Sequence, residues 1–358
     1  MTDNDYMTRA LALAARGLYT TTPNPRVGCV IVRDGEVVGE GWHARAGGPH
    51  AEVVALQEAA ARARGATAYV TLEPCHHYGR TPPCDEALVA AGLHRVVAAM
   101  QDPDPRTAGQ GLARLRAAGI LTDCGVGEDA ARELNIGFIS RVTRGRPWVR
   151  MKIAASLDGR TALNNGASQW ITGAAARLDG HQWRARACAL LTGIGTVKSD
   201  DPQLNVREVP TTRQPLRVII DSRLETPPTA KILAGGGSLL FCARDDAAKS
   251  AVLREAGAEI VVLPNTAGKV ELPALLQELG RRGINELHVE AGHKLNGSLI
   301  REGCVDELLL YLAPCLLGDR AQGMADLDEL TTLQARRALR IHETRMIDGD
   351  LRIIARMA

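Results

Sequence analysis

Apolar residues recur along this chain with two alternating periods, one typical of helices and one typical of strands. Residues 5–17 carry apolar side chains at helical spacing and end at a glycine, which predicts a helix. Residues 27–32 form an apolar run, followed by an Asp-Gly turn at 34–35 and an apolar pair at 37–38, which predicts a β-hairpin. Because this alternation continues along the chain, we expect an α/β protein.

The first part of the chain is predicted to end at a basic, turn-prone stretch, residues 141–147. Before it, helices are expected at 50–65, 84–92, 112–117 and 128–144, and strands at 68–72, 96–99 and 120–124. A length of 358 residues argues for two domains. We place them at residues 1–145 and 146–358.

The second part is again predicted to alternate strands with helices. Strands are expected at 148–155, 189–192, 216–221, 239–242, 259–263, 286–289 and 307–312, with helices between them, for example at 247–256 and 272–282. Such alternation implies a largely parallel sheet. Asp348-Gly349, between two apolar segments, predicts a closing hairpin.

Composition limits the partners of the protein. A net charge of +2 and an aromatic fraction of 3% provide neither the field nor the stacking surface that nucleic acid requires. The chain shows no apolar leader and no run of 18 apolar residues, which argues against a membrane segment. Eight scattered cysteines indicate a reducing compartment. We therefore expect a cytoplasmic protein that binds neither nucleic acid nor membrane.

The strongest chemical signal is the set His50, Glu52, Cys75 and Cys84. One imidazole and two thiolates fill three positions of tetrahedral zinc, and water fills the fourth with its pKa lowered towards roughly 7. A carboxylate two residues after the histidine is placed to move protons, as in the zinc deaminases. The deaminase pattern separates its two cysteines by two residues, whereas eight residues lie between Cys75 and Cys84.

Two other interpretations of these residues stay open. A buried free cysteine is more often a small core residue than a ligand. A structural zinc site normally takes four protein ligands, and His76 or His77 would supply the fourth. A structural site has no use for Glu52, which favours catalytic zinc.

Weaker signals follow several predicted strands of the second part. The turn at residues 290–297 precedes a helix, where backbone N–H groups are able to cradle a phosphate, but it lacks the G-x-G-x-x-G fingerprint. Polar stretches at 158–161, 168–172 and 191–207 are either solvated loops or parts of a ligand site. Open α/β sheets bind ligands at the carboxyl ends of their strands, where these stretches lie.

Taken together, these motifs make the chain resemble the bifunctional deaminase–reductases of riboflavin biosynthesis, over nearly its whole length. The resemblance is carried by residues 22–28 (TPNPRVG), 41–43 (GWH), 49–53 (PHAEV), 71–75 (TLEPC), 79–84 (GRTPPC), 155–160 (ASLDGR), 168–172 (SQWIT), 200–202 (DDP) and 289–292 (VEAG). Residues 79–84 account for the long spacing between the two cysteines. One departure is His-His-Tyr after Cys75, where relatives often carry Ser-His-His.

The resemblance implies a cytidine-deaminase-like first domain and a dihydrofolate-reductase-like second domain. It implies a ribosylated diaminopyrimidinone 5′-phosphate as substrate, from which zinc-activated water displaces ammonia while Glu52 relays protons. NADPH then delivers hydride to C1′ of the ribose, which opens to a ribityl chain. We also expect a homo-oligomer, either a dimer or a tetramer.

Site residues carry over from the resemblance one by one. It places zinc on His50, Cys75 and Cys84 and the proton shuttle on Glu52. It places NADPH on Ala154, Trp170, Thr196, Asp200, Ser222, Gly292, His293, Lys294, Leu295, Asn296, Gly297 and Ser298. It places the substrate on Ser168, Arg184, Leu204, Arg207 and Glu290. A forked guanidinium suits a phosphate dianion, although each arginine taken alone is more often a solvated charge.

Two rival functions differ in what they require. A zinc deaminase acting on a nucleic-acid base needs a basic groove and has no use for a second α/β domain. A zinc-stabilised binding module has no use for Glu52. For the reductase, Lys152 and Asp200 are candidate proton donors by location alone.

Overall fold

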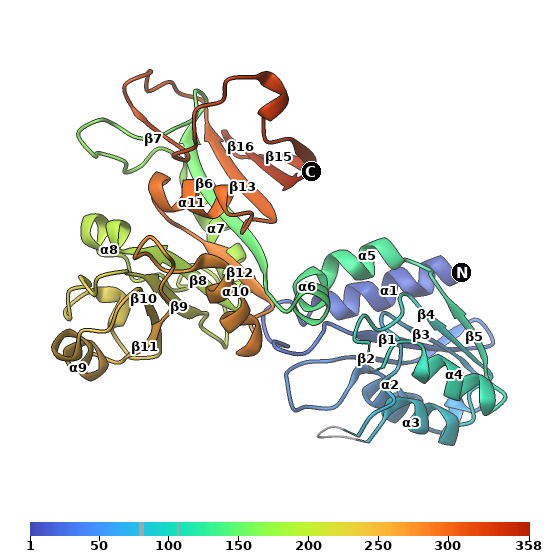
Figure 1. The fold of residues 1–358 in the computed structure, drawn as a ribbon. Helices are drawn as coiled ribbons and strands as arrows, with labels where there is room; N and C mark the ends of the chain where they lie inside the picture. The colour runs from blue at the N-terminus through green and yellow to red at the C-terminus, as the bar shows by residue number, and fades with distance from the viewer. Residues whose placement is uncertain (79–81, 106) are drawn as a thin grey trace. The chain divides into compact units, whose positions relative to one another are not determined.

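The computed structural model describes residues 1–78, 82–105 and 107–358. These residues fall into two compact units, Met1–Gly145 and Arg146–Ala358 (Figure 1). Each unit has a hydrophobic core of its own. No helix among the described residues is long and apolar enough to span a membrane.

The first unit is built on a five-stranded sheet of order β2-β1-β3-β4-β5. Its strands are β1 (Gly28–Arg33), β2 (Glu36–Trp42), β3 (Thr67–Val70), β4 (Arg95–Ala98) and β5 (Leu121–Cys124). The hairpin β1–β2 is antiparallel, as is the pair β1–β3, whereas β3, β4 and β5 run parallel. The predicted hairpin and the three later strands are confirmed.

Helices cover both faces of this sheet (Figure 1). They are α1 (Asp3–Ala15), α2 (Ala51–Ala59), α3 (Cys84–Ala90), α4 (Gln110–Ala117), α5 (Glu128–Leu134) and α6 (Ile136–Arg144). Glycines allow α2 to approach β2 closely. A Cβ atom at Gly39 would lie 2.2 Å from the Ala55 carbonyl oxygen, and one at Gly41 would lie 2.2 Å from that of Ala51. This close packing holds the first turn of α2 against the sheet.

Two predicted helices of the first unit are wrong in extent. Residues 128–144 form two helices that meet at Asn135, whose side chain accepts a hydrogen bond from the Arg26 backbone N–H at 2.8 Å and donates one to its carbonyl oxygen at 3.0 Å. The helix expected over 50–65 ends at Ala59, because Ala60 has a φ of 48° and a short 3-10 turn follows.

The second unit is built on a nine-stranded sheet of order β11-β10-β9-β8-β12-β6-β13-β16-β15. Its strands are β6 (Trp148–Ser156), β8 (Ala189–Gly193), β9 (Leu216–Ile220), β10 (Ser238–Cys242), β11 (Ala258–Val262), β12 (Glu286–Val289), β13 (Glu307–Ala313), β15 (Leu339–Ile347) and β16 (Asp350–Met357). The first seven strands in this order run parallel, and β15–β16 is the predicted closing hairpin. A small pair, β7 (Arg160–Ala162) and β14 (Gln322–Gly323), lies outside this sheet.

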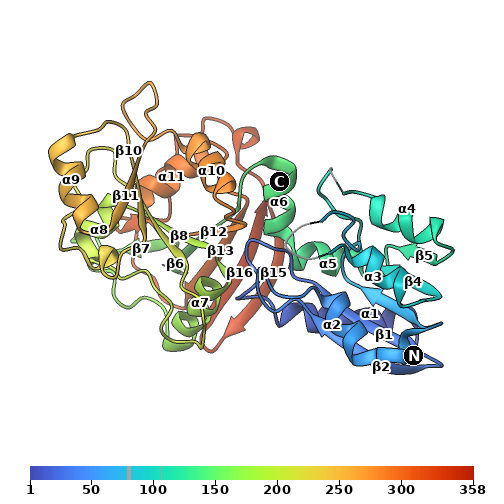
Figure 2. The same ribbon diagram turned by 90° about the horizontal axis from the view of Figure 1, so that it is seen from below.

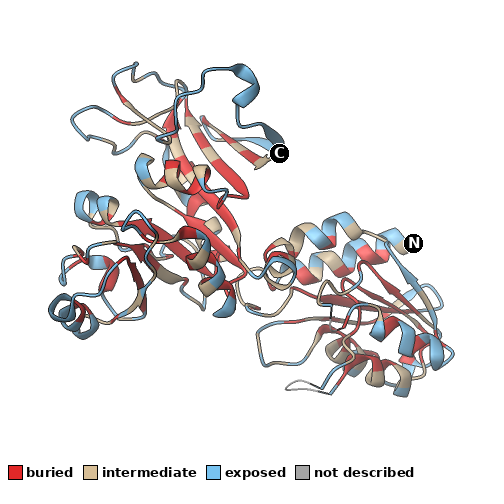
Figure 3. Ribbon diagram, viewed as in Figure 1, coloured by how far each residue is buried: buried red, intermediate tan, exposed pale blue. Residues whose placement is uncertain are grey.

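The central strands of this sheet are largely buried (Figure 3), and helices flank them (Figure 2). Many of their apolar side chains belong to two hydrophobic clusters. The helices that accompany them are α7 (Ala174–Arg186), α8 (Ile194–Asp200), α9 (Ala247–Glu255), α10 (Leu272–Arg281) and α11 (His293–Arg301). One core joins α10 and α11 to residues such as Leu239 and Leu287. The other joins α8 and α9 to Leu190 and Leu240. The start of the polar stretch 191–207 is therefore ordered structure, the end of β8 followed by α8.

Candidate metal centre and nucleotide cavity

The three proposed zinc ligands of the first unit come from separate parts of its fold. His50 is the N-cap residue of α2, and Cys84 is the first residue of α3. Cys75 follows the carboxyl end of β3. Their ligand atoms lie within 4.8 Å of one another, and no other residue in the described part of the chain belongs to this group.

The spacing of these atoms suits zinc. The His50 Nδ1 atom lies 3.2 Å from the Cys84 Sγ atom and 3.6 Å from the Cys75 Sγ atom. Tetrahedral zinc with bonds of about 2.0–2.3 Å holds its ligand atoms roughly 3.5 Å apart. Hydrogen bonding from Cys84 and His50 lowers the pKa of Cys75, and metal binds the thiolate.

Glu52 lies in the first turn of α2, with 3% of its surface exposed. Burial, helped by the charge of the Cys75 thiolate, raises the pKa of its carboxyl group to about 7. A carboxyl group with a pKa near the working pH is able both to accept and to release a proton. Such a carboxyl group is what the expected proton shuttle requires.

A second histidine, His43, packs against the first ligand and was not among the expected site residues. Its ring meets the His50 ring edge-on, with 5.4 Å between centroids. Its Nδ1 atom lies 2.9 Å from the Pro49 carbonyl oxygen, and its Nε2 atom lies 3.0 Å from the Asn24 amide nitrogen. Burial lowers the pKa of His43, so the ring is neutral and donates to Pro49 while it accepts from Asn24. Asn24 and His43 belong to the sequence motifs at 22–28 and 41–43, which could have identified them as residues of the site.

Glu73 anchors the loop that delivers Cys75. Its carboxylate accepts backbone hydrogen bonds from Asp102 at 3.1 Å, Gly109 at 2.9 Å and Leu112 at 3.0 Å. The side chain is 3% exposed. Three N–H donors to one buried carboxylate hold the end of β3 against the start of α4.

His76 has a partner of its own, because its Nδ1 atom lies 2.5 Å from the buried Asp85 carboxylate. Neither His76 nor His77 belongs to the metal-ligand group. Of the expected motif at 79–84, residues 79–81 lie outside the described residues.

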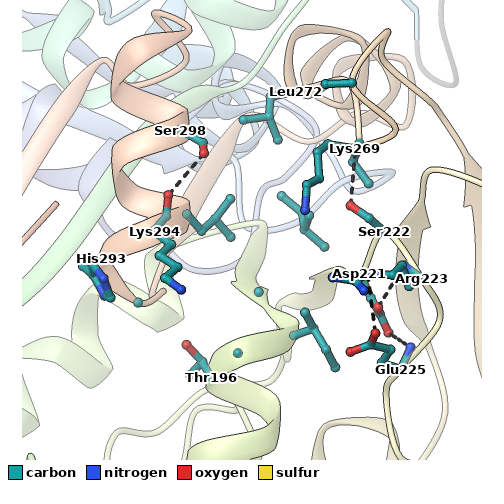
Figure 4. A pocket seen from close by; sticks show the side chains of 18 of the residues that line it. Thr196, Asp221, Ser222, Arg223, Glu225, Lys269, Leu272, His293, Lys294 and Ser298 are labelled. Carbon is teal, nitrogen blue, oxygen red and sulfur yellow. Dashed lines mark hydrogen bonds and ion pairs between the residues drawn. The ribbon is translucent and has the colours of Figure 1, made fainter. Parts of the chain in front are cut away.

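The second unit contains a cavity of about 850 Å³ at the carboxyl ends of its parallel strands (Figure 4). It lies beside the ends of β8 and β9, the first turn of α11 and the loop after β11. Small-molecule sites commonly enclose roughly 300–1,000 Å³. Among the described side chains none caps the N-terminus of α11, so its first backbone N–H groups are available to an anion.

Most of the expected NADPH residues line this cavity. Those that do are Thr196, Ser222, Gly292, His293, Lys294, Leu295 and Ser298. Asn296 and Gly297 turn away from it, because the Asn296 amide donates to the Met324 carbonyl oxygen and Gly297 lies against the backbone of Asp326. Ala154, Trp170 and Asp200 are not among the lining residues. Trp170 is 67% exposed and stacks on Arg177, with 4.6 Å from the guanidinium carbon to the ring centroid.

A second polar group lies at the carboxyl end of β12. The Arg184 guanidinium grips the Glu290 carboxylate with two hydrogen bonds, at 2.5 and 2.9 Å. Burial alone would raise the pKa of Glu290, but Arg184 holds it well below its usual range. The pKa of Lys152 on β6 is lowered by burial, an effect opposed by the charge of Glu290.

The other expected substrate residues surround this ion pair only in part. The Asn205 carbonyl oxygen accepts from Arg184 at 3.2 Å, and the Asn205 side chain accepts from Arg207 at 3.1 Å, so the segment around 205 links the two arginines. Leu204 is buried and has a φ of 45°. Ser168 lies apart from these residues in the sequence, on the loop after β7, and is partly buried.

Family models match both parts of the chain. A model of the RibD C-terminal domain matches residues 147–351, and a model of the cytidine and deoxycytidylate deaminase zinc-binding region matches residues 1–100. The riboflavin biosynthesis protein RibD of Escherichia coli is 46% identical over 98% of this chain and 98% of its own length. The RibD of Haemophilus influenzae is 47% identical over 97% of this chain and 95% of its own length.

Solved structures agree with these matches. Acinetobacter baumannii RibD superposes with a TM-score of 0.92 at 44% identity, covering 99% of both chains. A diaminohydroxyphosphoribosylaminopyrimidine deaminase/5-amino-6-(5-phosphoribosylamino)uracil reductase from Thermotoga maritima superposes with a TM-score of 0.86 at 30% identity, again over 99% of both chains.

Proposed function

Since this chain belongs to the RibD family of bifunctional riboflavin-biosynthesis enzymes, we propose which of its residues carry out each of the two reactions. The enzyme is a deaminase and a reductase, and its cofactors are Zn²⁺ and NADPH. Its first domain is cytidine-deaminase-like. We assign deamination to residues 1–145 and reduction to residues 146–358.

For the deaminase, the zinc ligands are His50, Cys75 and Cys84. When bound there, zinc supplies the Lewis acidity that makes water a nucleophile at neutral pH. Glu52 takes a proton from the water and passes it to the departing amine. This role suits a buried carboxyl group whose pKa is about 7. His43 orients the His50 ring by packing against its edge.

For the reductase, the cofactor binds in the cavity at the carboxyl ends of β8 and β9, with its pyrophosphate at the first turn of α11. NADPH supplies the hydride that adds to C1′ of the ribose. As the bond between C1′ and the ring oxygen breaks, that oxygen requires a proton. We assign this transfer to Lys152, because burial lowers its pKa, which eases release of a proton, while the charge of Glu290 opposes that shift. Asp200, the other candidate, lies at the exposed end of α8.

Replacing Lys152 distinguishes its proton transfer from cofactor binding. Lys152→Met is expected to abolish reduction of the deaminated substrate, because the ring oxygen loses its proton donor. NADPH affinity, measured by fluorescence titration, is expected to remain. If Lys152→Met still reduces the substrate at the parent rate, another group donates the proton.

The observation that carries the assignment is the convergence of His50, Cys75 and Cys84 beside the buried Glu52. The test is ammonia release from the diaminopyrimidinone ribonucleotide, measured on the full chain with and without a zinc chelator. Removal of zinc is expected to stop ammonia release and to leave NADPH oxidation with deaminated substrate unchanged. Persistent ammonia release by zinc-free enzyme would contradict the assignment, and release from an oligonucleotide would favour the nucleic-acid alternative.

We also propose a cytoplasmic homo-oligomer, assembled through β15. This strand forms one edge of the nine-stranded sheet, and its apolar side chains Leu339, Ile341 and Met346 are 44%, 63% and 60% exposed. An exposed apolar edge strand is a template for pairing with another chain. Light scattering should give a mass above that of one chain, and Ile341→Lys should lower it. None of the eight cysteines forms a disulfide bond.

A further inference from the structure

The nucleotide cavity has two ends that differ in chemistry (Figure 4). One end lies at the first turn of α11, beside Lys294 and Thr196. The other end lies beyond β9, where Ser222, Arg223 and Lys269 line the cavity. Figure 4 shows the side chains of Lys294 and Lys269 on separate elements, with the cavity between them.

The order of strands decides which end of the cofactor lies where. The reducing end of NADPH must meet the ribose beside Lys152 on β6 and Glu290 after β12. In the sheet, β8 and β9 continue outward from β12 on the side away from β6. A cofactor whose pyrophosphate lies at α11 therefore extends its adenosine half past β8 towards β9 and the loop after β11.

The loop after β11 is built to hold Lys269 beside Ser222. The Asn265 side chain accepts backbone hydrogen bonds from Ala267 at 3.0 Å and Lys269 at 2.9 Å, which fixes the turn. The next backbone N–H, that of Val270, donates to the Ser222 hydroxyl oxygen at 3.3 Å. The hydroxyl hydrogen of Ser222 remains available to a ligand.

Lys269 is the uncommitted cation at this end. None of the described acids pairs with its ammonium group, which lines the cavity. By contrast, the Arg223 guanidinium lies 3.5 Å from the Glu225 carboxylate, and Lys198 also pairs with Glu225, at 2.5 Å. An unpaired ammonium group beside a hydroxyl donor suits a phosphate dianion.

Asp221, the acid at the end of β9, is hydrogen-bonded within its own loop. The Asp221 carboxylate accepts backbone hydrogen bonds from Glu225 at 2.6 Å and Thr226 at 2.7 Å, and one from the Thr226 hydroxyl at 2.8 Å. An acid that binds the free 2′-hydroxyl of NADH needs an unoccupied carboxylate at such a position. The other oxygen of Asp221, which is 1% exposed and lines the cavity, accepts the Arg223 backbone N–H at 3.3 Å.

We propose that Lys269, with the hydroxyl group of Ser222, binds the 2′-phosphate of NADPH and thereby selects NADPH over NADH. The proposal rests on the cofactor position given under the proposed function. Lys294 binds the pyrophosphate, which NADPH and NADH share. Replacing Lys294 should therefore affect both cofactors, whereas replacing Lys269 should affect NADPH alone.

The test is calorimetric titration of the full chain with adenosine 2′,5′-bisphosphate and with 5′-AMP, neither of which requires turnover. Lys269→Ala is expected to weaken binding of the bisphosphate by about 10- to 100-fold, which corresponds to the loss of one charge-assisted hydrogen bond. The affinity for 5′-AMP should be unchanged. Lys269→Arg should retain the preference for the bisphosphate. The ratio of kcat/KM for NADPH over NADH should fall in parallel in Lys269→Ala.

Two control variants separate this role from a general effect of charge. Lys294→Ala should weaken both ligands equally, because both carry the shared 5′-phosphate. Lys231→Ala removes a charge paired with Asp201 outside the cavity and should change neither affinity. If Lys269→Ala keeps the preference, or weakens both ligands alike, the assignment of Lys269 is overturned. If the parent chain binds the bisphosphate and 5′-AMP equally well, both the proposed cofactor position and the 2′-phosphate subsite are contradicted.

Discussion

At the scale of single residues, Glu52 shows how burial prepares a side chain for chemistry. Its sequence position, two residues after His50, indicated a proton shuttle, but only the fold shows that the carboxyl group is buried. Burial disfavours the charged form and brings its pKa to about 7. The ordinary pKa of a glutamate would leave it almost wholly deprotonated at neutral pH.

Replacement of Glu52 by glutamine tests this role directly. Glu52→Gln is expected to keep zinc, because the three ligands are untouched, and to lose deamination by about 10²- to 10⁴-fold. The measurements are ammonia release and metal content of the purified protein. Reduction of already deaminated substrate serves as the internal control and should be unchanged. Deamination near the parent rate would assign the shuttle to another group.

At the scale of elements, strands and helices were predictable where their own residues determine them. Apolar runs marked the parallel strands of the second unit, and an Asp-Gly turn marked the hairpin β15–β16. The break between α5 and α6 was not predictable, because it depends on Asn135 binding Arg26, which is 109 positions away in the chain. Arg150 is 1% exposed within β6, between Glu286 at 3.0 Å and Glu307 at 2.5 Å, and these distant partners are equally invisible in the strand's own pattern.

The helix α7 carries a buried histidine, His181. Burial, together with the charges of Arg184 and Arg207, lowers the pKa of His181 to about 4. The His181 Nδ1 atom accepts a hydrogen bond from the Arg207 backbone at 3.4 Å, which requires the neutral ring. In the folded state His181 resists protonation, whereas in the unfolded state it has its ordinary pKa of 6.5. Below pH 6.5 the unfolded state therefore binds more protons than the folded state.

We therefore expect His181 to contribute stability above pH 6.5 that is lost as the pH falls from 6.5 to about 4. The measurement is urea unfolding of the parent chain and of His181→Gln in a series of buffers across that interval. The free energy of unfolding should fall less steeply in the variant. Parallel curves for the two proteins would show that this histidine does not titrate as its surroundings indicate.

At the scale of the whole molecule, the sequence motifs located the metal site better than the nucleotide site. His50, Cys75 and Cys84 are recognisable because zinc demands particular residue types at short spacing. The cavity of the second unit is assembled from residues between 193 and 322, most of them of types that any surface loop contains. Lys269 gave no signal in the sequence, since its significance depends on lying beside Ser222.

The two activities are expected to separate at the junction between α6 and β6. Each proposed site draws its residues from one unit only, and each unit has its own core. A fragment of residues 1–145 should bind zinc and release ammonia but leave NADPH untouched. Its complement, residues 146–358, should oxidise NADPH with deaminated substrate and be indifferent to chelators, with circular dichroism verifying that both are folded.

A variant of the intact chain gives the same comparison without cutting it. Cys84→Ser removes one zinc ligand, so metal content and ammonia release should fall together, while NADPH oxidation with deaminated substrate should persist. Metal binding and local folding are coupled, so the loss is expected to extend to the loop after Cys75. A folded fragment of residues 146–358 that requires zinc, or an intact Cys84→Ser protein that no longer oxidises NADPH, would show that the reductase depends on the metal site.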